Sequence, residues 1–342
     1  MMYASATALA LARAGLSVAL VEPREAGAPG DAWDIRVYAI SPDSEALLSR
    51  LGAWPGLDAA RAQNVYRMDV HGDASGELLL DAYAAGVPKL ATILESAHLQ
   101  HALWQAACAH DNIQIICPAN VSDVVWGTPV SSLTLDNGAK LETELVVGAD
   151  GAQSMIRQRA GIEAKVSSYQ QSGVVANFEI DKPHRGTAFQ WFRQFKPGCG
   201  DIVAYLPLPG NRMSLVWSTA TEHAQALLAL GEQAFCAQVE QAGESHLGSL
   251  RLITPPAAFP LRLIQTDKPV RPGCALVGDA AHGVHPLAGQ GVNLGFGDVT
   301  ALAEIMARRG KAGCGDLALL ERYARRRAEP VARMQFVTDS LW

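Results

Sequence analysis

The chain has 342 residues, which is enough for about two domains and a large buried core. Its 28 Lys+Arg against 34 Asp+Glu give a formal charge of −6 without any block of five or six like charges, which argues against a nucleic-acid binder. The 49% of hydrophobic and 18% of charged residues are typical of a globular protein. Residues 4–12 form the longest near-apolar run, which is far short of the ~20 residues that span a bilayer. No signal peptide is readable, so we expect a cytoplasmic protein.

The six cysteines are scattered and form no Cys-x-x-Cys pair, which argues against a zinc ribbon or a disulfide scaffold. Two His-x-x-His pairs occur, His98/His101 and His282/His285, but neither has an acidic or cysteine partner at metal-ligand spacing. We therefore expect no metal site.

The start of the chain resembles part of a nucleotide-binding unit. Residues 4–14 are good helix formers that end at Gly15, and residues 17–21 form a short apolar run that ends at Glu22. Helix, glycine, strand and acid are, in this order, the second half of a βαβ unit that binds a nucleotide. The first strand and its Gly-x-Gly-x-x-Gly loop do not precede them, and Ala4 stands where the third glycine would fall.

The rest of the chain alternates helical and strand patterns. The stretch 172–219 alternates strand and turn, which predicts an antiparallel sheet. We expect further helices at 44–51, 97–110, 153–160, 220–241, 292–309 and 317–341, and further strands at 66–71, 77–80, 113–116, 121–125, 132–135, 141–147 and 273–277.

Two short segments after predicted strands hold weak candidates for a ligand site. Glu22, at the tip of a strand, suits a bond to ribose hydroxyls, although taken alone it is better explained as a solvated charge at a strand end. In Gly148-Ala149-Asp150-Gly151, the glycines allow a close approach of a ligand, and Asp150 can accept hydrogen bonds or cap the helix that contains Arg157. Asp-Gly is also common in plain turns, so this pattern alone decides little.

Residues 278–298 carry the most specific pattern. A predicted strand leads to Gly278 and Asp279, so a carboxylate lies at the carboxyl end of a strand, where open α/β sheets bind ligands. A turn with Pro286 and then the run Gly-Gln-Gly at 289–291 lead into a helix whose first amides can face an electron-rich ligand. The number of specified positions argues against a chance match.

This segment resembles the flavin-binding signature of the FAD-dependent aromatic-ring hydroxylases that share the para-hydroxybenzoate hydroxylase fold. More narrowly, residues 285–298, His-Pro-Leu-Ala-Gly-Gln-Gly-x-Asn-x-Gly-x-x-Asp, are similar to the ubiquinone-biosynthesis hydroxylases of the UbiH/UbiF/VisC type. The resemblance covers nearly the whole chain and is also carried by residues 34–36, 39–41, 148–151, 205–208, 214–217 and 338–341.

The resemblance implies an α/β fold, with a Rossmann-like FAD-binding domain that is N-terminally incomplete and an inserted antiparallel β-sheet domain for the substrate. Residues 1–65, 90–170 and 266–342 would form the first domain, and residues 66–89 and 171–265 the second. Because the missing first strand would be central to the parallel sheet, we expect the strands at 18–21 and 274–277 to lack a neighbour. We expect the chain as given to be free of FAD for the same reason.

The resemblance also implies a role for each motif residue. Glu22 would bind the adenosine ribose, Arg36 would lie near the pyrophosphate, and Asp279 would hold the ribityl or pyrophosphate part. Asp150 and Gly151 would lie between the flavin and the path of the nicotinamide. The flavin ring would face Pro286, Gly289, Gln290 and Gly291. The whole set of expected FAD contacts is Glu22, Arg36, Gln100, Ala149, Asp150, Gly151, Gly278, Asp279, Pro286, Gly289, Gly291 and Asn293, of which Gln100 is better explained as a surface side chain of a helix.

The implied activity is hydroxylation of the aromatic ring of a prenylated phenol or quinone precursor in ubiquinone biosynthesis, with FAD as cofactor and NAD(P)H and O₂ as co-substrates. The chemistry belongs to the flavin, so no side-chain acid or base is required. Trp191, Tyr205 and Pro207 are the candidate walls of the substrate pocket. Two alternatives stay open: another FAD-dependent oxidoreductase that acts on a lipid-like substrate, and an FAD-free, non-catalytic member. Peripheral association with the inner membrane or a biosynthetic complex, and a homo-oligomer, are compatible with the sequence.

Overall fold

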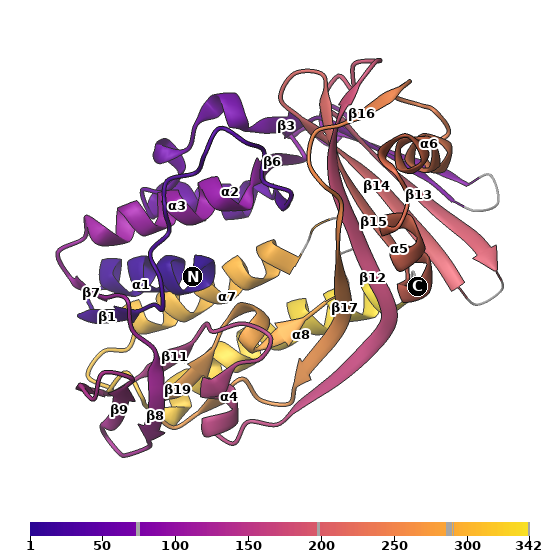
Figure 1. Ribbon diagram of the computed structural model, residues 1–342. Coiled ribbons are helices and arrows are strands. Elements are labelled where there is room, and N and C mark those ends of the chain that lie inside the picture. The colour runs from indigo at the N-terminus through magenta and orange to yellow at the C-terminus, as the bar shows by residue number, and fades with distance from the viewer. Residues whose placement is uncertain (73–75, 197–198, 285–288, 290, 341–342) are drawn as a thin grey trace.

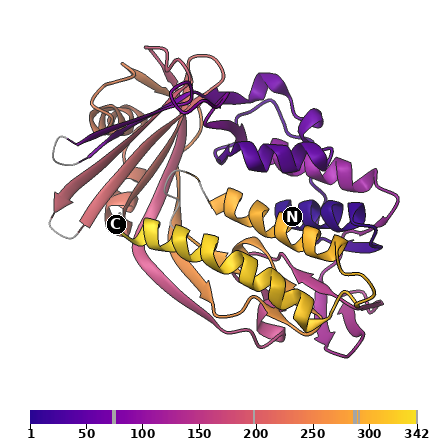
Figure 2. The same ribbon diagram turned by 180° about the vertical axis from the view of Figure 1, so that it is seen from behind.

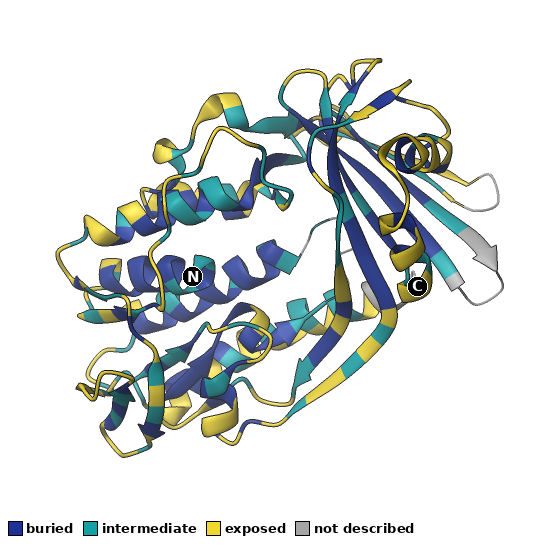
Figure 3. Ribbon diagram, viewed as in Figure 1, coloured by how far each residue is buried: buried dark blue, intermediate teal, exposed yellow. Residues whose placement is uncertain are grey.

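The structure is a computed structural model that describes residues 1–72, 76–196, 199–284, 289 and 291–340. Helices and short strands form one part of the molecule, and a large sheet, antiparallel except where β4 pairs with β13, stands beside them (Figures 1 and 2). Buried side chains concentrate in the central helices and along the strands of the large sheet (Figure 3). The predicted α/β fold is confirmed.

The first helix packs in the middle of the nucleotide-binding part. Helix α1 (Met2–Arg13) consists mostly of alanine and leucine, and nearly all of its side chains are buried against α3 (Ser96–Cys108) and α7 (Gly291–Ala307). The chain then enters β1 (Val18–Val21), which pairs in parallel with β7 (Ile113–Ile116). Helix α8 (Leu317–Ser340) packs along α7.

A second small sheet lies nearby and has the order β11 (Val146–Gly148), β19 (Cys274–Leu276), β18 (Val270–Arg271). The N–H of Leu276 donates to the carbonyl of Pro269 at 2.8 Å, and that of Val277 to the carbonyl of Gly148 at 3.0 Å. The expectation that this strand lacks a neighbour is therefore wrong, because the chain reverses at Gly273 (φ +71°) and adds β18 to its free side. Strand β1, by contrast, has β7 as its only partner in the described part of the chain.

The large sheet has nine strands, and its longest strand, β12, spans Ala164–Ile180. The expected domain boundary at 170/171 falls inside this strand, at a bulge between Ser168 and Ser172. Helices α5 (Thr221–Leu228) and α6 (Glu232–Ala242) cover one face of the sheet. The other strands, from one edge to the other, are β20 (His282–Gly283), β17 (Ala257–Thr266), β15 (Arg212–Ala220), β14 (Cys199–Leu208), β13 (Thr187–Lys196), β4 (Arg67–His71) and β5 (Glu77–Asp81), while β16 (Leu250–Leu252) pairs with β12.

A three-stranded sheet packs against part of the other face of the large sheet. It has the order β2 (Val37–Ile40), β6 (Ala91–Glu95), β3 (Gln63–Val65), and its buried side chains meet Ala188, Leu206 and Leu208. Helix α2 (Pro42–Arg50) follows β2. The remaining elements are a meander of β8 (Val121–Val125), β9 (Ser131–Leu135) and β10 (Lys140–Thr143), and the short helix α4 (Met155–Arg159).

Two element predictions are wrong in detail. The expected helix at 220–241 is two helices, because the chain breaks after Leu228 and Gly231 starts α6 afresh. The expected strand at 141–147 is two strands in different sheets: β10 completes the meander, and β11 joins β19.

Candidate active site

Asp279 lies directly after β19, in a short turn formed by Gly278–Ala280. Its side chain is reached by solvent, yet protein atoms surround much of it, and this partial burial raises the pKa of the carboxyl. Nearby Asp298 raises that pKa further, whereas His282 lowers it. In the described part of the chain no hydrogen bond reaches the carboxylate. An accessible acceptor at the end of a parallel strand fits the hydroxyl groups of an FAD ribityl chain.

A buried ion cluster lies behind this turn and holds it in place. Asp298, on α7, is fully buried and accepts hydrogen bonds from the backbone N–H of Gly278 at 2.9 Å, Nε2 of His282 at 2.7 Å and Nε of Arg327 at 2.7 Å. Burial alone would raise the pKa of Asp298, but His282 and Arg327 outweigh it and hold that pKa below its usual value. The motif contained Asp298, but its pattern assigned this residue no role, and no sequence signal indicates Arg327.

Two glycines of the motif are explained by packing against one ring. A Cβ atom on Gly278 (φ +57°) or on Gly295 would lie 2.4 Å from ring atoms of Tyr3. The Tyr3 ring also meets Phe296 edge-on, with 5.8 Å between the ring centroids. Glycine at both positions therefore lets α1 and α7 approach the turn that carries Asp279.

Arg36 is held at the end of a tightly fixed segment. Oδ1 of Asp34 accepts the N–H of Arg36 at 3.0 Å, and Oδ2 accepts the N–H of Ala97 at the start of α3 at 2.9 Å. The carboxylate of Glu95 is fully buried and accepts a hydrogen bond from the N–H of Asp34 at 2.6 Å. It also accepts two hydrogen bonds from the guanidinium of Arg61, both 2.7 Å long. The Arg36 side chain itself is exposed, and its Cζ lies 5.8 Å from the centroid of the Phe259 ring. Its contact with FAD phosphates stays a prediction.

The Asp-Gly motif is tied to the Asp279 turn by an arginine. Asp150 accepts hydrogen bonds from Oγ of Ser154 at 2.5 Å and from the N–H of Ile156 at 3.0 Å, so it caps α4. Gly151 has φ +84°, a backbone conformation that residues with a side chain rarely adopt. The buried guanidinium of Arg157 donates to the carbonyl of Ala280 at 2.9 Å and to that of Ala152 at 2.8 Å. The sequence placed Arg157 on this helix but gave no sign of that bridge.

The other expected FAD contacts are partly engaged with protein. Asn293 accepts the N–H of Ser41 at 2.9 Å and donates to the carbonyl of Ala39 at 2.8 Å, so it fixes the start of α7 against β2. Glu22 is buried and pairs with the Met1 ammonium at 3.1 Å, and Gln100 donates to Oγ of Ser96 at 2.7 Å. Ala149 is half-buried, as are Gly289 and Gly291, while Pro286 and Gln290 lie outside the described residues.

The expected walls of the substrate pocket lie on the other side of the large sheet. Trp191 is 1% and Tyr205 2% exposed, and both pack under α5 and α6. The Tyr205 hydroxyl donates to the carbonyl of Val239 in α6. Pro207 pairs with Met213, which belongs to the same cluster, and therefore lies on the same face. This prediction fails because strand alternation leaves both faces of a buried sheet apolar, and the sequence does not indicate which face the helices cover.

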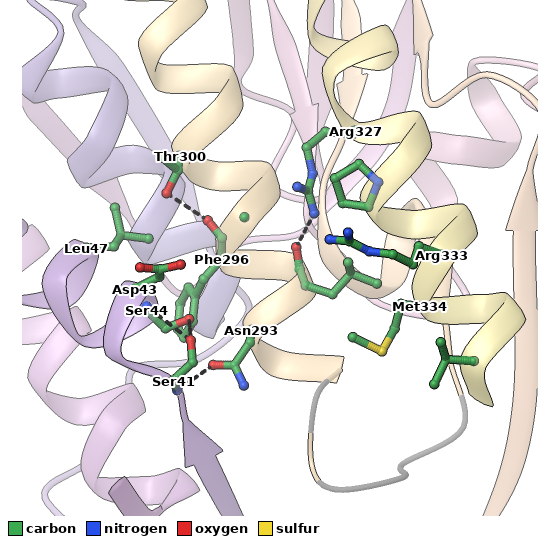
Figure 4. Close-up of a pocket in the computed structure, with 14 residues that line it drawn as sticks. Ser41, Asp43, Ser44, Leu47, Asn293, Phe296, Thr300, Arg327, Arg333 and Met334 are labelled. Atoms are coloured by element: carbon green, nitrogen blue, oxygen red, sulfur yellow. Dashed lines mark hydrogen bonds between the residues drawn. The ribbon is translucent and has the colours of Figure 1, made fainter. Parts of the chain in front are cut away.

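A cavity of about 430 Å³ lies between α2, α7 and α8 (Figure 4). It borders the site at Asn293, and Arg327 of the ion cluster forms part of its wall. It does not include Asp279 or the end of β19. Its lining residues are Ser41, Asp43, Ser44, Leu47, Asn293, Leu294, Phe296, Gly297, Thr300, Arg327, Pro330, Arg333, Met334 and Val337.

Comparison with known proteins agrees with this geometry. The model of the FAD binding domain family matches residues 5–337. The chain belongs to this FAD-binding family. One relative, 3-demethoxyubiquinol 3-hydroxylase of Escherichia coli, is 35% identical over 332 residues, 95% of this chain and 83% of that protein. The ubiquinone hydroxylase UbiL of Rhodospirillum rubrum is 34% identical over 98% of this chain and 77% of its own. The human ubiquinone biosynthesis monooxygenase COQ6 is 34% identical over 80% of this chain and 66% of its own.

Two solved structures share the fold. Pseudomonas aeruginosa PqsL in complex with 2-aminobenzoylacetate superimposes with a TM-score of 0.82 at 20% identity, over 99% of this chain and 92% of that one. Klebsiella pneumoniae HpxO with FAD gives a TM-score of 0.74 at 16% identity, over 98% of this chain and 86% of that one. The protein is thus an FAD-dependent monooxygenase of the ubiquinone-biosynthesis hydroxylases. Its described helices include none long and apolar enough to cross a membrane.

Proposed function

We propose that this protein hydroxylates the aromatic ring of a prenylated phenol or quinone precursor, with NAD(P)H as the electron donor and O₂ as the oxygen source. The observation that carries the proposal is the Asp279 turn, where an accessible carboxylate, to which no described residue donates a hydrogen bond, lies at the end of β19. Names of the relatives, which include a demethoxyubiquinol hydroxylase, support the class of substrate.

The residues present fit FAD. Asp279 would accept hydrogen bonds from the ribityl hydroxyls, Glu22 would accept them from the ribose hydroxyls, and Arg36 would face the phosphates. The start of α7, with Gly289 and Gly291, would lie against the flavin ring. When bound, FAD supplies the transfer of electrons from NAD(P)H and the activation of O₂.

The protein residues would position the cofactor and keep water away from it. Asp298 and Arg157 hold the backbone on either side of Asp279, so the carboxylate presents its oxygens in one direction. Asn293 fixes the start of α7 against the end of β2. Gly151, next to the Asp150 cap, would leave room for the nicotinamide to approach. Because the tail of the proposed substrate is apolar, the proposal includes peripheral association with the membrane that contains it.

Titration of the chain with FAD, followed by phenol-dependent oxidation of NADH and of NADPH, tests this function. The sequence alone led us to expect a chain free of FAD, but β19 has a strand on both sides and the FAD binding domain family matches residues 5–337, so we now expect FAD to bind. We expect oxidation of the nicotinamide to accelerate when a prenylated phenol is added, with a hydroxylated product seen by mass spectrometry. FAD binding without any hydroxylated product from prenylated phenols would contradict the proposed substrate.

A further inference from the structure

Positive charge is concentrated near the end of the chain. Residues 308–333 contain eight of the 28 Lys+Arg side chains but only three of the 34 Asp+Glu, in a chain whose formal charge is −6. Most of this stretch belongs to α8. Figure 2 shows α8, in yellow, along the outside of the molecule with no other element in front of it. A positive surface on an acidic protein attracts a negatively charged partner to that one side.

The arginines of α8 gather on its outer side. Spacings of three, four and seven residues place four of them along one side of the helix, and all four are exposed. We call this set the basic face of α8; its members are Arg322, Arg325, Arg326 and Arg333. At 1.5 Å per residue, the basic face is about 17 Å long. The other side of α8 carries the buried Leu320 and Tyr323 and packs along α7.

Neighbouring carboxylates neutralise little of this charge. Arg325 lies 3.7 Å from Glu321 and Arg326 lies 2.6 Å from Glu304, yet the two arginine side chains stay 69% and 47% exposed. Ion pairs this exposed are weak and exchange readily with other partners. The other two arginines of the basic face pair with no carboxylate of the described residues. Glu329 shares this side of the helix, which leaves a net positive charge on it.

Two apolar side chains follow the basic face. Phe336 and Val337 come one turn after Arg333 and are 73% and 44% exposed. Arginines beside an exposed aromatic ring match a lipid surface, where the charges meet headgroups and the ring enters the boundary of the acyl chains. A nucleic-acid duplex would attract the arginines but offers no apolar layer to the ring. The combination therefore favours a bilayer over another polyanion.

The apolar end of α8 lies next to the large sheet. Nε2 of Gln335 donates to the carbonyl of Ile264 at 3.3 Å, and Nε2 of Gln265 donates to Oε1 of Gln335, also at 3.3 Å. Ile264 and Gln265 belong to β17 and pair with β20, the strand that follows the Asp279 turn. A bilayer at the basic face would therefore adjoin the part of the molecule in which the large sheet meets the candidate active site.

We propose that the basic face and Phe336 dock the protein on the negatively charged surface of a lipid bilayer. The choice of a bilayer rests on the proposed function, because the tail of a prenylated substrate resides in a membrane. Attraction between the arginines and anionic headgroups provides most of the affinity, and salt weakens it. The helix lies parallel to the surface, so docking requires no segment that crosses the bilayer.

Sedimentation with vesicles tests the proposal on two matched triple variants of the full chain, with FAD present. The vesicles consist of phosphatidylcholine alone, or of phosphatidylcholine and phosphatidylglycerol at about two to one. One variant, Arg322→Gln/Arg325→Gln/Arg333→Gln, removes three charges of the basic face, and the control, Arg50→Gln/Lys140→Gln/Lys165→Gln, removes three exposed charges elsewhere. We expect the wild type to bind the mixed vesicles only. The first variant should bind them on the order of 100-fold more weakly, at about fivefold per arginine, and the control within about twofold of the wild type.

Phe336→Gln should weaken binding to the mixed vesicles about fivefold. Equal losses of vesicle affinity in the two triple variants, or no binding of the wild type to the mixed vesicles, would overturn the assignment. It would also be overturned if the wild type bound a DNA duplex as tightly as the mixed vesicles and Phe336→Gln had no effect, because the face would then attract any polyanion.

Hydroxylation of a short prenylated phenol dissolved in detergent separates this proposal from the proposed function. If the product forms but the mixed vesicles are not bound, only the docking surface fails. If the vesicles are bound as expected but no hydroxylated product forms, the proposed function fails and the docking surface stands.

Discussion

Nε2 of His282 lies 2.7 Å from Oδ2 of Asp298, and this buried pair joins the turn after β19 to helix α7. The same carboxylate also holds Arg327 of α8 and the backbone of Gly278. One side chain thus fixes three elements around the position at which Asp279 presents its carboxylate. The arrangement of the cofactor site therefore depends on a group that does not itself face the cofactor.

Replacing Asp298 with asparagine should destabilise the fold strongly. It leaves Arg327, whose side chain is 12% exposed, without its counter-charge, and breaking a largely buried pair in this way costs about 3–5 kcal/mol. Denaturant unfolding of Asp298→Asn measures the loss. Glu304→Gln, which breaks the half-exposed pair with Arg326 (2.6 Å), is the control and should cost no more than about 1 kcal/mol. Equal losses of unfolding free energy in the two variants would show that the cluster around Asp298 stabilises the fold no more than a half-exposed ion pair does.

The same carboxylate should make the protein sensitive to acid. Because the pKa of Asp298 is lowered in the folded state, its contribution to stability is present above the usual carboxyl pKa of about 4. That contribution is lost as the pH falls through the lowered pKa. We expect the difference in unfolding free energy between wild type and Asp298→Asn to shrink below about pH 4, as urea titrations at several pH values would reveal. A difference that stays constant down to pH 2 would contradict the assignment.

The Asp279 carboxylate, unlike that of Asp298, should lower the stability of the FAD-free chain while it contributes to FAD binding. Partial burial raises its pKa, so the folded chain without cofactor loses stability as the pH rises from about 4 through that raised value. Asp279→Asn removes the charge and should raise the melting temperature of the FAD-free chain at pH 7. It should also weaken FAD binding about 10- to 150-fold, through the loss of a charge-assisted hydrogen bond. Unchanged FAD affinity in this variant would remove Asp279 from the cofactor site.

Asp34 should act on the cofactor through Arg36. Asp34→Ala removes the acceptor for Ala97 at the start of α3 and the acceptor for the Arg36 backbone, at a cost of about 1 kcal/mol in stability. We expect FAD affinity, measured by flavin fluorescence, to fall as well. Asp58, which accepts the N–H of Ala60 at 2.8 Å on an exposed turn, provides the control. Asp58→Ala should affect stability alone, and an equal loss of FAD affinity there would argue against a role of the 34–36 segment.

The sequence predicted best those parts of the molecule whose local pattern and tertiary role coincide. Helix 4–14 and strand 17–21 are found as α1 and β1, and the strand before Gly278 is found as β19. In α1 and β19 burial on nearly all sides demands continuous apolar residues, and a glycine follows each of the three elements or the turn next to it. Strand β17, which contains Pro260 and Arg262, was not predicted, because its half-exposed face gives no regular alternation of apolar and polar residues.

The residues that hold the candidate site in place were harder to predict than the residues expected to contact FAD. Asp279 follows from its position after a strand, but the partners of Asp298 come from Gly278, His282 and Arg327, up to 29 residues away in the chain. No local pattern encodes such a meeting of side chains. The same holds for Trp191 and Tyr205, whose aromatic character suited a pocket until the placement of α5 and α6 showed them to be core.

The origin of the inserted oxygen tests the account most directly. The protein is incubated with FAD, NADH or NADPH, and a prenylated phenol under oxygen-18 gas. The mass of the product is then measured by mass spectrometry. We predict a product that carries one oxygen-18 atom on the ring. At limiting FAD, the Asp279→Asn variant should form less of this product than the wild type, because it binds FAD more weakly. A product whose new oxygen comes from water, or NAD(P)H oxidation that never yields a hydroxylated ring, would contradict the assignment as an aromatic hydroxylase.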